Sequence, residues 1–141
     1  MPLPIEPGTA FAARVEQHLD HDRIAWLVTV DADGTPQPSP IWFLRDADSI
    51  LIFSRPDTGK VRNIAVRPRV AIHFNGDNNG GDIVVLTGLA ALAPDAPPAN
   101  AIPEYLEKYR AGLLDIGMTP DSFAAEYSAA IRIVPERIRG H

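Results

Sequence analysis

The stretch ILIFSRPDTGKVRNIAVRPRVAI, residues 50–72, holds the pattern on which the fold depends. Its two ends, ILIFS and RVAI, are rich in β-branched and other apolar residues and are typical of strands. Between them, Val61 and Ile64 fall at helical spacing, which predicts a short helix over residues 57–66 that ends before Pro68. The stretch therefore predicts a strand, a loop, a helix and a second strand in close succession.

The loop between this strand and this helix is basic, because it holds Arg55, Lys60 and Arg62 beside a proline and a glycine. The first amides of a helix have no partner within the helix and attract negative charge. The hydroxyls of Ser54 and Thr58 can donate further hydrogen bonds. Two interpretations stay open: a site for a phosphate group, or a capped helix start with solvated basic side chains. In both, we expect the side chain of Lys60 to face solvent when no ligand is bound.

Before this stretch, the pattern predicts a helix over residues 9–20, capped by Thr9, and then the strand RIAWLVTV. The segment TPQPSPIWFL follows a DADG turn. Its prolines at positions 36, 38 and 40 lack N–H donors. We therefore expect an irregular or edge entry that becomes a regular strand only at IWFL.

This proline-rich segment has two interpretations. Gln37, Ser39 and Ile41 keep their amides, so the segment can present donors and carbonyls to a flat heterocycle. The alternative is an edge strand that its prolines protect from pairing. The two tryptophans, Trp26 and Trp42, are interpreted as core residues rather than as the wall of a cofactor site.

The second half of the chain predicts three further strands. The strand RVAIHF leads into a loop rich in Asn and Gly, and the long strand 82–93 has a bulge or bend at Gly88. A helix is expected to end near Gly112, a shorter helix capped by Thr119 follows, and the last strand is interrupted at Pro135. Roughly six strands with short links predict mainly β structure with helices (α+β), as a β-barrel or strongly curved sheet.

Length and composition exclude several classes. The 141 residues suffice for a single domain, residues 1–141, and the net charge of −5 disfavours nucleic acid as a partner. The chain has no cysteine, no apolar run of about 18 residues that could span a membrane, and no signal peptide pattern. We therefore expect a soluble cytoplasmic protein. The histidines lack metal-ligand spacing, so no metal is expected, and His18 and His21 are expected to be exposed.

Three segments taken in order resemble a known family. WLVTVDADGTPQPSPIWFL, ILIFSRPDTGKVRNIAVRPRVAI and GGDIVVLTGLAAL are similar to the split β-barrel flavin and deazaflavin oxidoreductases, which are related to pyridoxamine 5′-phosphate oxidase. The resemblance covers residues 9–139 and is greatest to the F420-dependent branch from actinobacteria. It implies a six-stranded antiparallel split β-barrel of the FMN-binding, pyridoxamine 5′-phosphate oxidase-like (PNPOx-like) type.

The resemblance also implies a homodimer whose two cofactor sites lie between the subunits. The basic loop would hold the cofactor phosphate, the proline-rich segment would border the ring, and the NNGGD loop and the IRG segment of the partner would close the site. The residues that the resemblance and the local pattern assign to the cofactor are Gln37, Ser39, Ile41, Phe53, Ser54, Arg55, Thr58, Lys60, Arg62, Asn63, Asn79 and Gly80.

The function implied by the resemblance is an oxidoreductase that transfers hydride from reduced coenzyme F420 to an electron-poor small molecule. The alternatives are an FMN-dependent oxidase or reductase and a non-catalytic protein that binds a flavin, a deazaflavin or a tetrapyrrole. Arg67 and Arg69 would extend the basic patch toward the acidic tail of F420. The ending VPERIRGH lacks the tryptophan of the vitamin oxidases, which counts against that activity, and the sequence identifies no catalytic residue.

Overall fold

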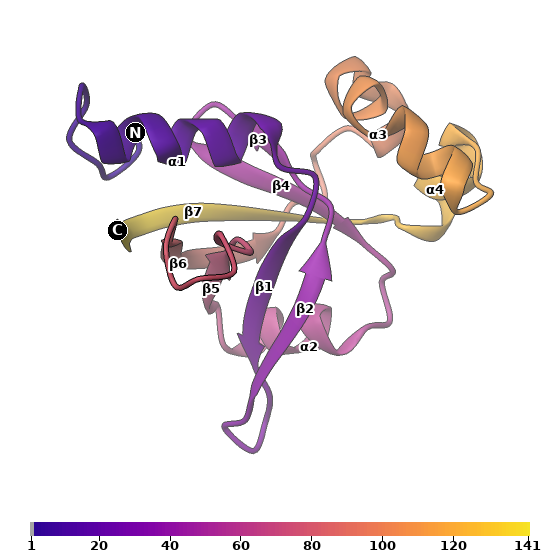
Figure 1. The fold of residues 1–141 in the computed structure, drawn as a ribbon. Helices are drawn as coiled ribbons and strands as arrows, with labels where there is room; N and C mark the ends of the chain where they lie inside the picture. Colours follow the sequence, from indigo (N-terminus) through magenta and orange to yellow (C-terminus); the bar gives the residue numbers. More distant parts are fainter. Residues whose placement is uncertain (1) are drawn as a thin grey trace.

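A computed structural model describes residues 2–141 as one curled, seven-stranded antiparallel sheet with four α-helices around it (Figure 1). The strand order is β2-β1-β5-β6-β7-β4-β3. The strands are β1 (Ala25–Val30), β2 (Pro36–Ile41), β3 (Leu44–Asp46), β4 (Ser49–Ser54), β5 (Arg69–His73), β6 (Val84–Leu92) and β7 (Ala129–Gly140). The helices are α1 (Ala10–His21), α2 (Gly59–Val66), the single 3₁₀ turn η1 (Ala99–Ala101), α3 (Pro103–Asp115) and α4 (Pro120–Glu126). This confirms the expected α+β split barrel, with seven strands where six were expected.

The proline-rich segment is a regular edge strand, so the expectation of irregular backbone there is wrong. All six residues of β2 pair with β1, from Val30 opposite Pro36 to Ala25 opposite Ile41. Neighbouring residues of a strand turn their backbone groups to opposite sides, so prolines at alternate positions place their donor-free nitrogens on the side away from β1. The interpretation as a proline-protected edge is confirmed.

The expected IWFL strand does not form, and this accounts for the additional strand. β2 ends at Ile41, Trp42 and Phe43 leave the sheet, and Leu44 begins the three-residue strand β3. β3 pairs only with β4 and forms the other edge of the sheet. The two edge strands, β2 and β3, are therefore consecutive in the chain and are separated only by Trp42 and Phe43.

The long strands β6 and β7 pair along their whole length, with a bulge at the position predicted by Gly88. Thr87 pairs with Arg137 and Gly88 with Pro135, so β7 has one additional residue at this point. A Cβ atom on Gly88 would collide with the backbone of Val134 and Pro135, so only glycine fits there. Pro135 does not interrupt β7, because the bulge accommodates it.

Strand β4 is buried on both faces. Ile50 and Ile52 point into the barrel core, where residues of α1 and α2 such as Val15 and Ile64 also pack. Leu51 and the other face of β4 contact a second core formed by η1, α3 and α4. Figure 1 shows α3 and α4 together beside the sheet and α1 on the other side of it. The small β-barrel thus has helices on its outside at this strand.

The predicted caps of α1 and α4 are confirmed, whereas the predicted end of α3 is wrong. The side chain of Thr9 accepts a hydrogen bond from Ala12 N, and Thr119 forms a capping box with Ser122. Helix α3 continues past Gly112 to Asp115, and Gly117 follows with φ +70°. None of the helices in residues 2–141 has the length and apolar character that crossing a membrane requires.

Candidate functional site

Two adjoining pockets lie where β2, the end of β4 and the start of α2 meet. The larger has a volume of about 730 Å³ and is called the polar pocket; the smaller, of about 260 Å³, is called the aromatic pocket. The polar pocket is lined by Thr29, Asp31, Ala32, Gln37, Pro38, Ser39, Thr58, Gly59, Lys60, Arg62, Asn63, Val66 and Arg67. The aromatic pocket is lined by Pro40, Ile41, Trp42, Phe53, Ser54, Lys60, Ile116, Phe123 and Tyr127. Strand β2 runs along both pockets, and Lys60 belongs to both.

Lys60 is half-buried, which corrects the expectation of a solvent-facing side chain. Its ammonium group forms no salt bridge within residues 2–141, and burial lowers its pKa. A partly desolvated cation without a counter-ion is costly, and an anion in either pocket would neutralise it. The start of α2 adds unpaired amides at the same place, because Thr58 caps the helix without a side-chain hydrogen bond.

The hydroxyls predicted to bind phosphate form hydrogen bonds within the loop. Ser54 Oγ donates to the carbonyl of Arg55 over 2.9 Å, and Thr58 Oγ1 donates to the same carbonyl over 3.3 Å. The two hydroxyl oxygens lie 3.1 Å apart. Both side chains still line the pockets, Ser54 the aromatic and Thr58 the polar one, but their hydrogen bonds set the shape of the loop.

Arg55 lines neither pocket. Its guanidinium forms an ion pair with Glu126 of α4 and lies 5.4 Å from the ring centre of Tyr127. It therefore joins the basic loop to α4. Arg69 is also elsewhere, since it is exposed on β5 and pairs with Glu136.

Hydrogen bonds attach α2 to β1 and orient the basic side chains of the polar pocket. Asn63 is buried, and its Nδ2 donates to Thr29 Oγ1 over 3.0 Å. Arg67 Nε donates to the carbonyl of Val30 over 2.8 Å. Arg62 is exposed and donates to the carbonyl of Asp57 over 2.7 Å. Asn63 thus positions the helix, while Arg62 and Arg67 add positive charge to the pocket.

One carboxylate opposes this charge. Asp31 accepts hydrogen bonds from the side chain of Gln37, from Thr35 N and from Asp33 N, and these bonds lower its pKa. The polar pocket therefore has three cations and one anion around it, an excess of positive charge on an acidic protein. Asp31 escaped the sequence analysis because its DADG context predicts only a turn.

Stacked rings form the wall of the aromatic pocket. Trp42 stacks on Tyr109 of α3 at 4.5 Å between ring centroids and on Phe123 of α4 at 5.5 Å, and Phe123 stacks on Tyr127 at 4.5 Å. Gly112 is the reason that Trp42 fits, since a Cβ there would lie 2.9 Å from Trp42 Cζ2. Trp42 is therefore both packed against the second core and part of a pocket wall, which the core interpretation missed.

The other predicted residues divide between the pockets and more distant places. Gln37, Ser39, Ile41 and Phe53, which are predicted to contact the cofactor, each line one of the pockets. Trp26 lies on the outer face of the sheet, where its Nε1 donates to Asn75 Oδ1 over 2.8 Å. The loop residues Asn79 and Gly80 line neither pocket of the same chain. Their place at the partner subunit's site stays a prediction.

The residues that the sequence analysis missed come from separate segments. Phe123 and Tyr127 belong to or follow α4, and Ile116 follows α3. No motif connects them, because only the packing of both helices on β4 brings them to Lys60. The sequence held one local signal for Trp42. It directly follows Ile41, the last residue of the segment predicted to border the ring, so it could have been expected to lie near the same ligand.

The chain belongs to the pyridoxamine 5′-phosphate oxidase family, whose model matches residues 11–141. No curated protein matches the sequence. A solved F420 reductase is similar in fold, with a TM-score of 0.68, 24% identity, and coverage of 96% of this chain and 98% of that chain. The conserved hypothetical protein Rv2991 of Mycobacterium tuberculosis has a TM-score of 0.69 at 20% identity, covering 97% of this chain and 84% of that one.

A haem storage protein is also among the similar structures. HutZ of Vibrio cholerae has a TM-score of 0.64 at 15% identity and covers 94% of this chain and 95% of that chain. At these identities the solved structures support the fold, which proteins with different ligands share. The choice of ligand therefore has to come from the residues of the two pockets.

Gly112→Ala should displace the indole of Trp42. Alanine favours a helix over glycine by about 1 kcal/mol, but the added methyl would press on a ring already fixed by Tyr109 and Phe123, and overpacking costs about 1–3 kcal/mol. We expect a net loss of about 1 kcal/mol in urea unfolding together with a changed near-ultraviolet circular dichroism signal.

The reverse substitution at the neighbouring exposed position, Ala111→Gly, is the control. It should destabilise α3 through helix propensity alone and leave the aromatic signal unchanged. A stabilised Gly112→Ala protein with an unchanged aromatic signal would contradict the assignment of Gly112 to Trp42.

Proposed function

We propose that the two pockets together bind a flavin-type cofactor, with coenzyme F420 as the preferred one. The protein would then be a reductase in which the cofactor supplies hydride to an electron-poor small molecule. The chain's own residues bind and orient the cofactor and exclude water from its apolar end. An FMN-dependent oxidase or reductase is the alternative.

The observation that carries this proposal is Lys60, a half-buried and unpaired ammonium group at the junction of the two pockets. On one side of it lie Arg62, Arg67 and the first amides of α2, which suit a phosphate. On the other side lie the stacked rings of the aromatic pocket, which suit a flat apolar surface. A phosphorylated cofactor with a planar ring system has both of these parts.

The free edge of β2 fits the polar rim of such a ring. The amides of Gln37, Ser39 and Ile41 point toward β1, where they form the ladder. The expectation that they face outward, toward a ring, is therefore wrong. The prolines leave carbonyl oxygens without neighbouring N–H groups on the outer side. This edge can therefore accept hydrogen bonds from ring N–H groups but cannot donate any.

The haem alternative has less support. Histidine is a common axial ligand of haem iron, and none of the histidines in residues 2–141 lines either pocket of its own chain. The phosphate-sized cluster of positive charge is also better matched to a flavin or deazaflavin than to a porphyrin. The similarity to HutZ therefore supports a common fold rather than a common ligand.

Lys60→Ala should weaken binding of F420 by about 1.5–3 kcal/mol, the range for a hydrogen bond to a charged group. Isothermal titration calorimetry with F420 measures this effect directly. The melting temperature should stay the same or rise, because the substitution removes a desolvated and unpaired charge.

Arg69→Ala serves as the matched control, since Arg69 is an exposed cation outside both pockets. Its effect on F420 binding should be close to zero. An unchanged dissociation constant for Lys60→Ala would remove Lys60 from the site, and a large drop in its melting temperature would make the lysine structural.

The preference between cofactors should depend on salt. F420 carries carboxylates beyond its phosphate, and the exposed Arg62 and half-buried Arg67 are placed to meet them. Each exposed ion pair contributes about 0–1 kcal/mol, and a tenfold preference needs about 1.4 kcal/mol. We expect F420 to bind more tightly than FMN at low ionic strength, with the difference narrowing as salt screens the charges. Equal or tighter binding of FMN at low salt would favour the FMN alternative.

We also propose a homodimer, as the resemblance implies. The outer face of the sheet has an exposed apolar pair at β6 and β7, where Leu89 and Val134 lie directly opposite each other and are 38% and 45% exposed. This short apolar strip lies between Arg132 and Arg137 on the same face of β7. An exposed apolar strip rimmed by polar residues in the middle of a sheet is the kind of surface that a second copy covers.

Val134→Asp should shift the dimer to monomer in sedimentation velocity at micromolar concentration, because a desolvated charge at an apolar interface is costly. Leu114→Asp is the control, since Leu114 is 75% exposed on α3 outside this strip, and it should leave the dimer intact. A monomeric native protein would defeat both the dimer and the idea of shared sites.

A further inference from the structure

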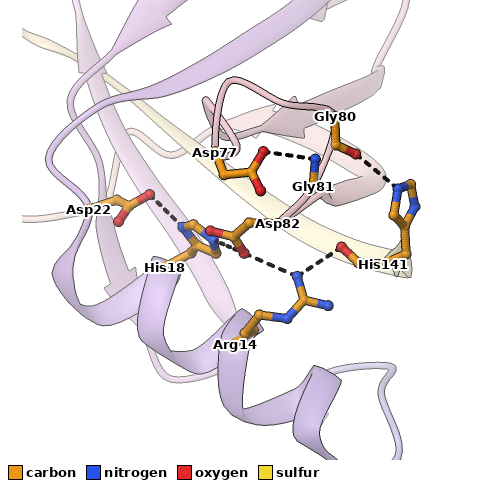
Figure 2. Close-up of polar contacts among 8 residues, drawn as sticks. All are labelled: Arg14, His18, Asp22, Asp77, Gly80, Gly81, Asp82 and His141. Atoms are coloured by element: carbon orange, nitrogen blue, oxygen red, sulfur yellow. Dashed lines mark hydrogen bonds and ion pairs between the residues drawn. The ribbon is translucent and has the colours of Figure 1, made fainter.

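A half-buried histidine connects helix α1 to the loop before β6. The side chain of His18 is 12% exposed, which corrects the expectation that it is exposed. Its Nδ1 lies 2.6 Å from Asp22 Oδ2 and its Nε2 lies 3.0 Å from Asp82 Oδ1 (Figure 2). Asp22 caps the end of α1, whereas Asp82 ends the segment that we call the 75–82 loop.

Charged groups from three directions face this histidine. Arg14, one turn earlier on α1, donates both to Asp82 Oδ1 over 3.0 Å and to the backbone carbonyl of His141 over 2.9 Å. Asp77 lies in the same loop and repels the charge of Asp82. Lys108 of α3 lies on the other side, where it interacts with Asp22.

Two carboxylates on the two ring nitrogens favour a doubly protonated ring. A neutral imidazole has one N–H donor, so only the imidazolium can donate to Asp22 and Asp82 at once. Burial opposes the charge, but the hydrogen bonds to Asp82 and Asp22 outweigh it, and the pKa of His18 is raised above its ordinary value. The stacking of the ring on Phe74, at 4.8 Å between ring centroids, fixes its orientation toward both acids.

The neutral ring would keep one contact and lose the other. Asp22 is four residues away on the same helix and is the closer partner, so the remaining proton stays on Nδ1. Nε2 then turns a lone pair toward the carboxylate of Asp82, and the long-range hydrogen bond is lost. Asp82 has a left-handed backbone, with φ 53°, which a non-glycine residue adopts only when other contacts hold it.

We propose that His18 is a proton-dependent latch: its imidazolium, together with Arg14, holds the 75–82 loop against α1, and the loss of one proton leaves Asp82 held by Arg14 alone and loosens the loop there. Gly80 of this loop accepts from the ring of His141, over 3.1 Å, so a looser loop also changes this side-chain contact, while the backbone of His141 stays bonded to Ile83. Figure 2 shows the contacts that connect α1, the loop and His141.

The sign of the pH dependence follows from the raised pKa. The latch is fully closed below the ordinary histidine value of 6.5 and opens as the pH rises through the higher pKa of His18 in the folded protein. A protein at a pH above that raised pKa would therefore have the looser loop. Physiological changes of pH fall in this range for histidine.

The latch acts on the cofactor site only if the proposed function holds. Asn79 and Gly80 of this loop are the residues expected to close the site of the partner subunit. A closed latch would then favour bound cofactor, and deprotonation of His18 would weaken its binding. The latch itself is testable without any cofactor.

Two measurements on the full chain test the latch. NMR titration of the imidazole signals should give His18 a pKa above the ordinary histidine value of 6.5. Hydrogen exchange, corrected for the intrinsic effect of pH, should show that the amides of Asn79 and Gly81 lose protection as His18 titrates. We expect the protection factors of these amides to fall roughly threefold or more. The equilibrium between the closed and open loop changes by up to about tenfold for each pKa unit by which His18 differs between the two states.

Variants separate the latch from a merely structural contact. His18→Gln cannot gain a proton, so its loop should have low protection that no longer depends on pH, whereas His21→Gln should behave like the native protein. Asp82→Asn should lower the pKa of His18, because it removes one of the two acids that raise it. A His18 pKa at or below its ordinary value, or the same protection of the loop at all pH values in the native protein, would overturn the proposal.

The coupling to the cofactor site has its own test. The dissociation constant for F420 should rise with pH in the native protein more than in His18→Gln. If the dissociation constant for F420 depends on pH identically in the two proteins, while hydrogen exchange still shows the latch, the coupling is overturned but the latch is not. A complete failure to bind F420 or FMN in either protein would overturn the proposed function without touching the exchange result.

Discussion

The burial of β4 on both faces is the constraint on which the rest of the structure depends. A strand in a small barrel usually has one face in the core, but in β4 Leu51 and Phe53 are buried as well as Ile50 and Ile52. Covering the outer face requires α3 and α4, and their aromatic side chains then lie where β4 ends. The basic loop begins at that same end. The two pockets therefore meet at Lys60 because the apolar outer face of β4 has to be covered. The helices that cover it, α3 and α4, lie next to the basic loop.

The two lysines show how the chain treats positive charge. Apart from histidine, the other basic side chains are arginines, and several of them are exposed and paired with carboxylates, as Arg69 is with Glu136. Both lysines are half-buried and form no salt bridge within residues 2–141. Lys108 lies over the ring of Phe43 at 3.7 Å and donates to its carbonyl, and burial lowers its pKa to about 8. A protein contact thus partly stabilises the charge of Lys108, whereas at Lys60 a ligand would have to do so.

The local sequence pattern was sufficient to predict most helices and strands, whereas the remaining features depend on tertiary packing. Thr9, Thr119 and Gly88 act within a few residues of themselves, so a cap and a bulge could be predicted from the sequence. Gly112 was misinterpreted as a helix end because a glycine that makes room for a distant indole has the same local pattern as one that ends a helix. In the site, the residues of β2 and the basic loop were predictable because they are contiguous. Asp31, Phe123 and Tyr127 were not, because they reach the pockets only through tertiary packing.

The sheet is open, and its two edges differ in how they resist growth. β2 turns the donor-free side of three prolines to the outside, and β3 is only three residues long. Neither edge can serve as a template for a further strand, which is the common route from an open sheet to fibrous aggregates. The curled sheet can therefore stay unclosed at high concentration in a crowded cell without polymerising through its backbone.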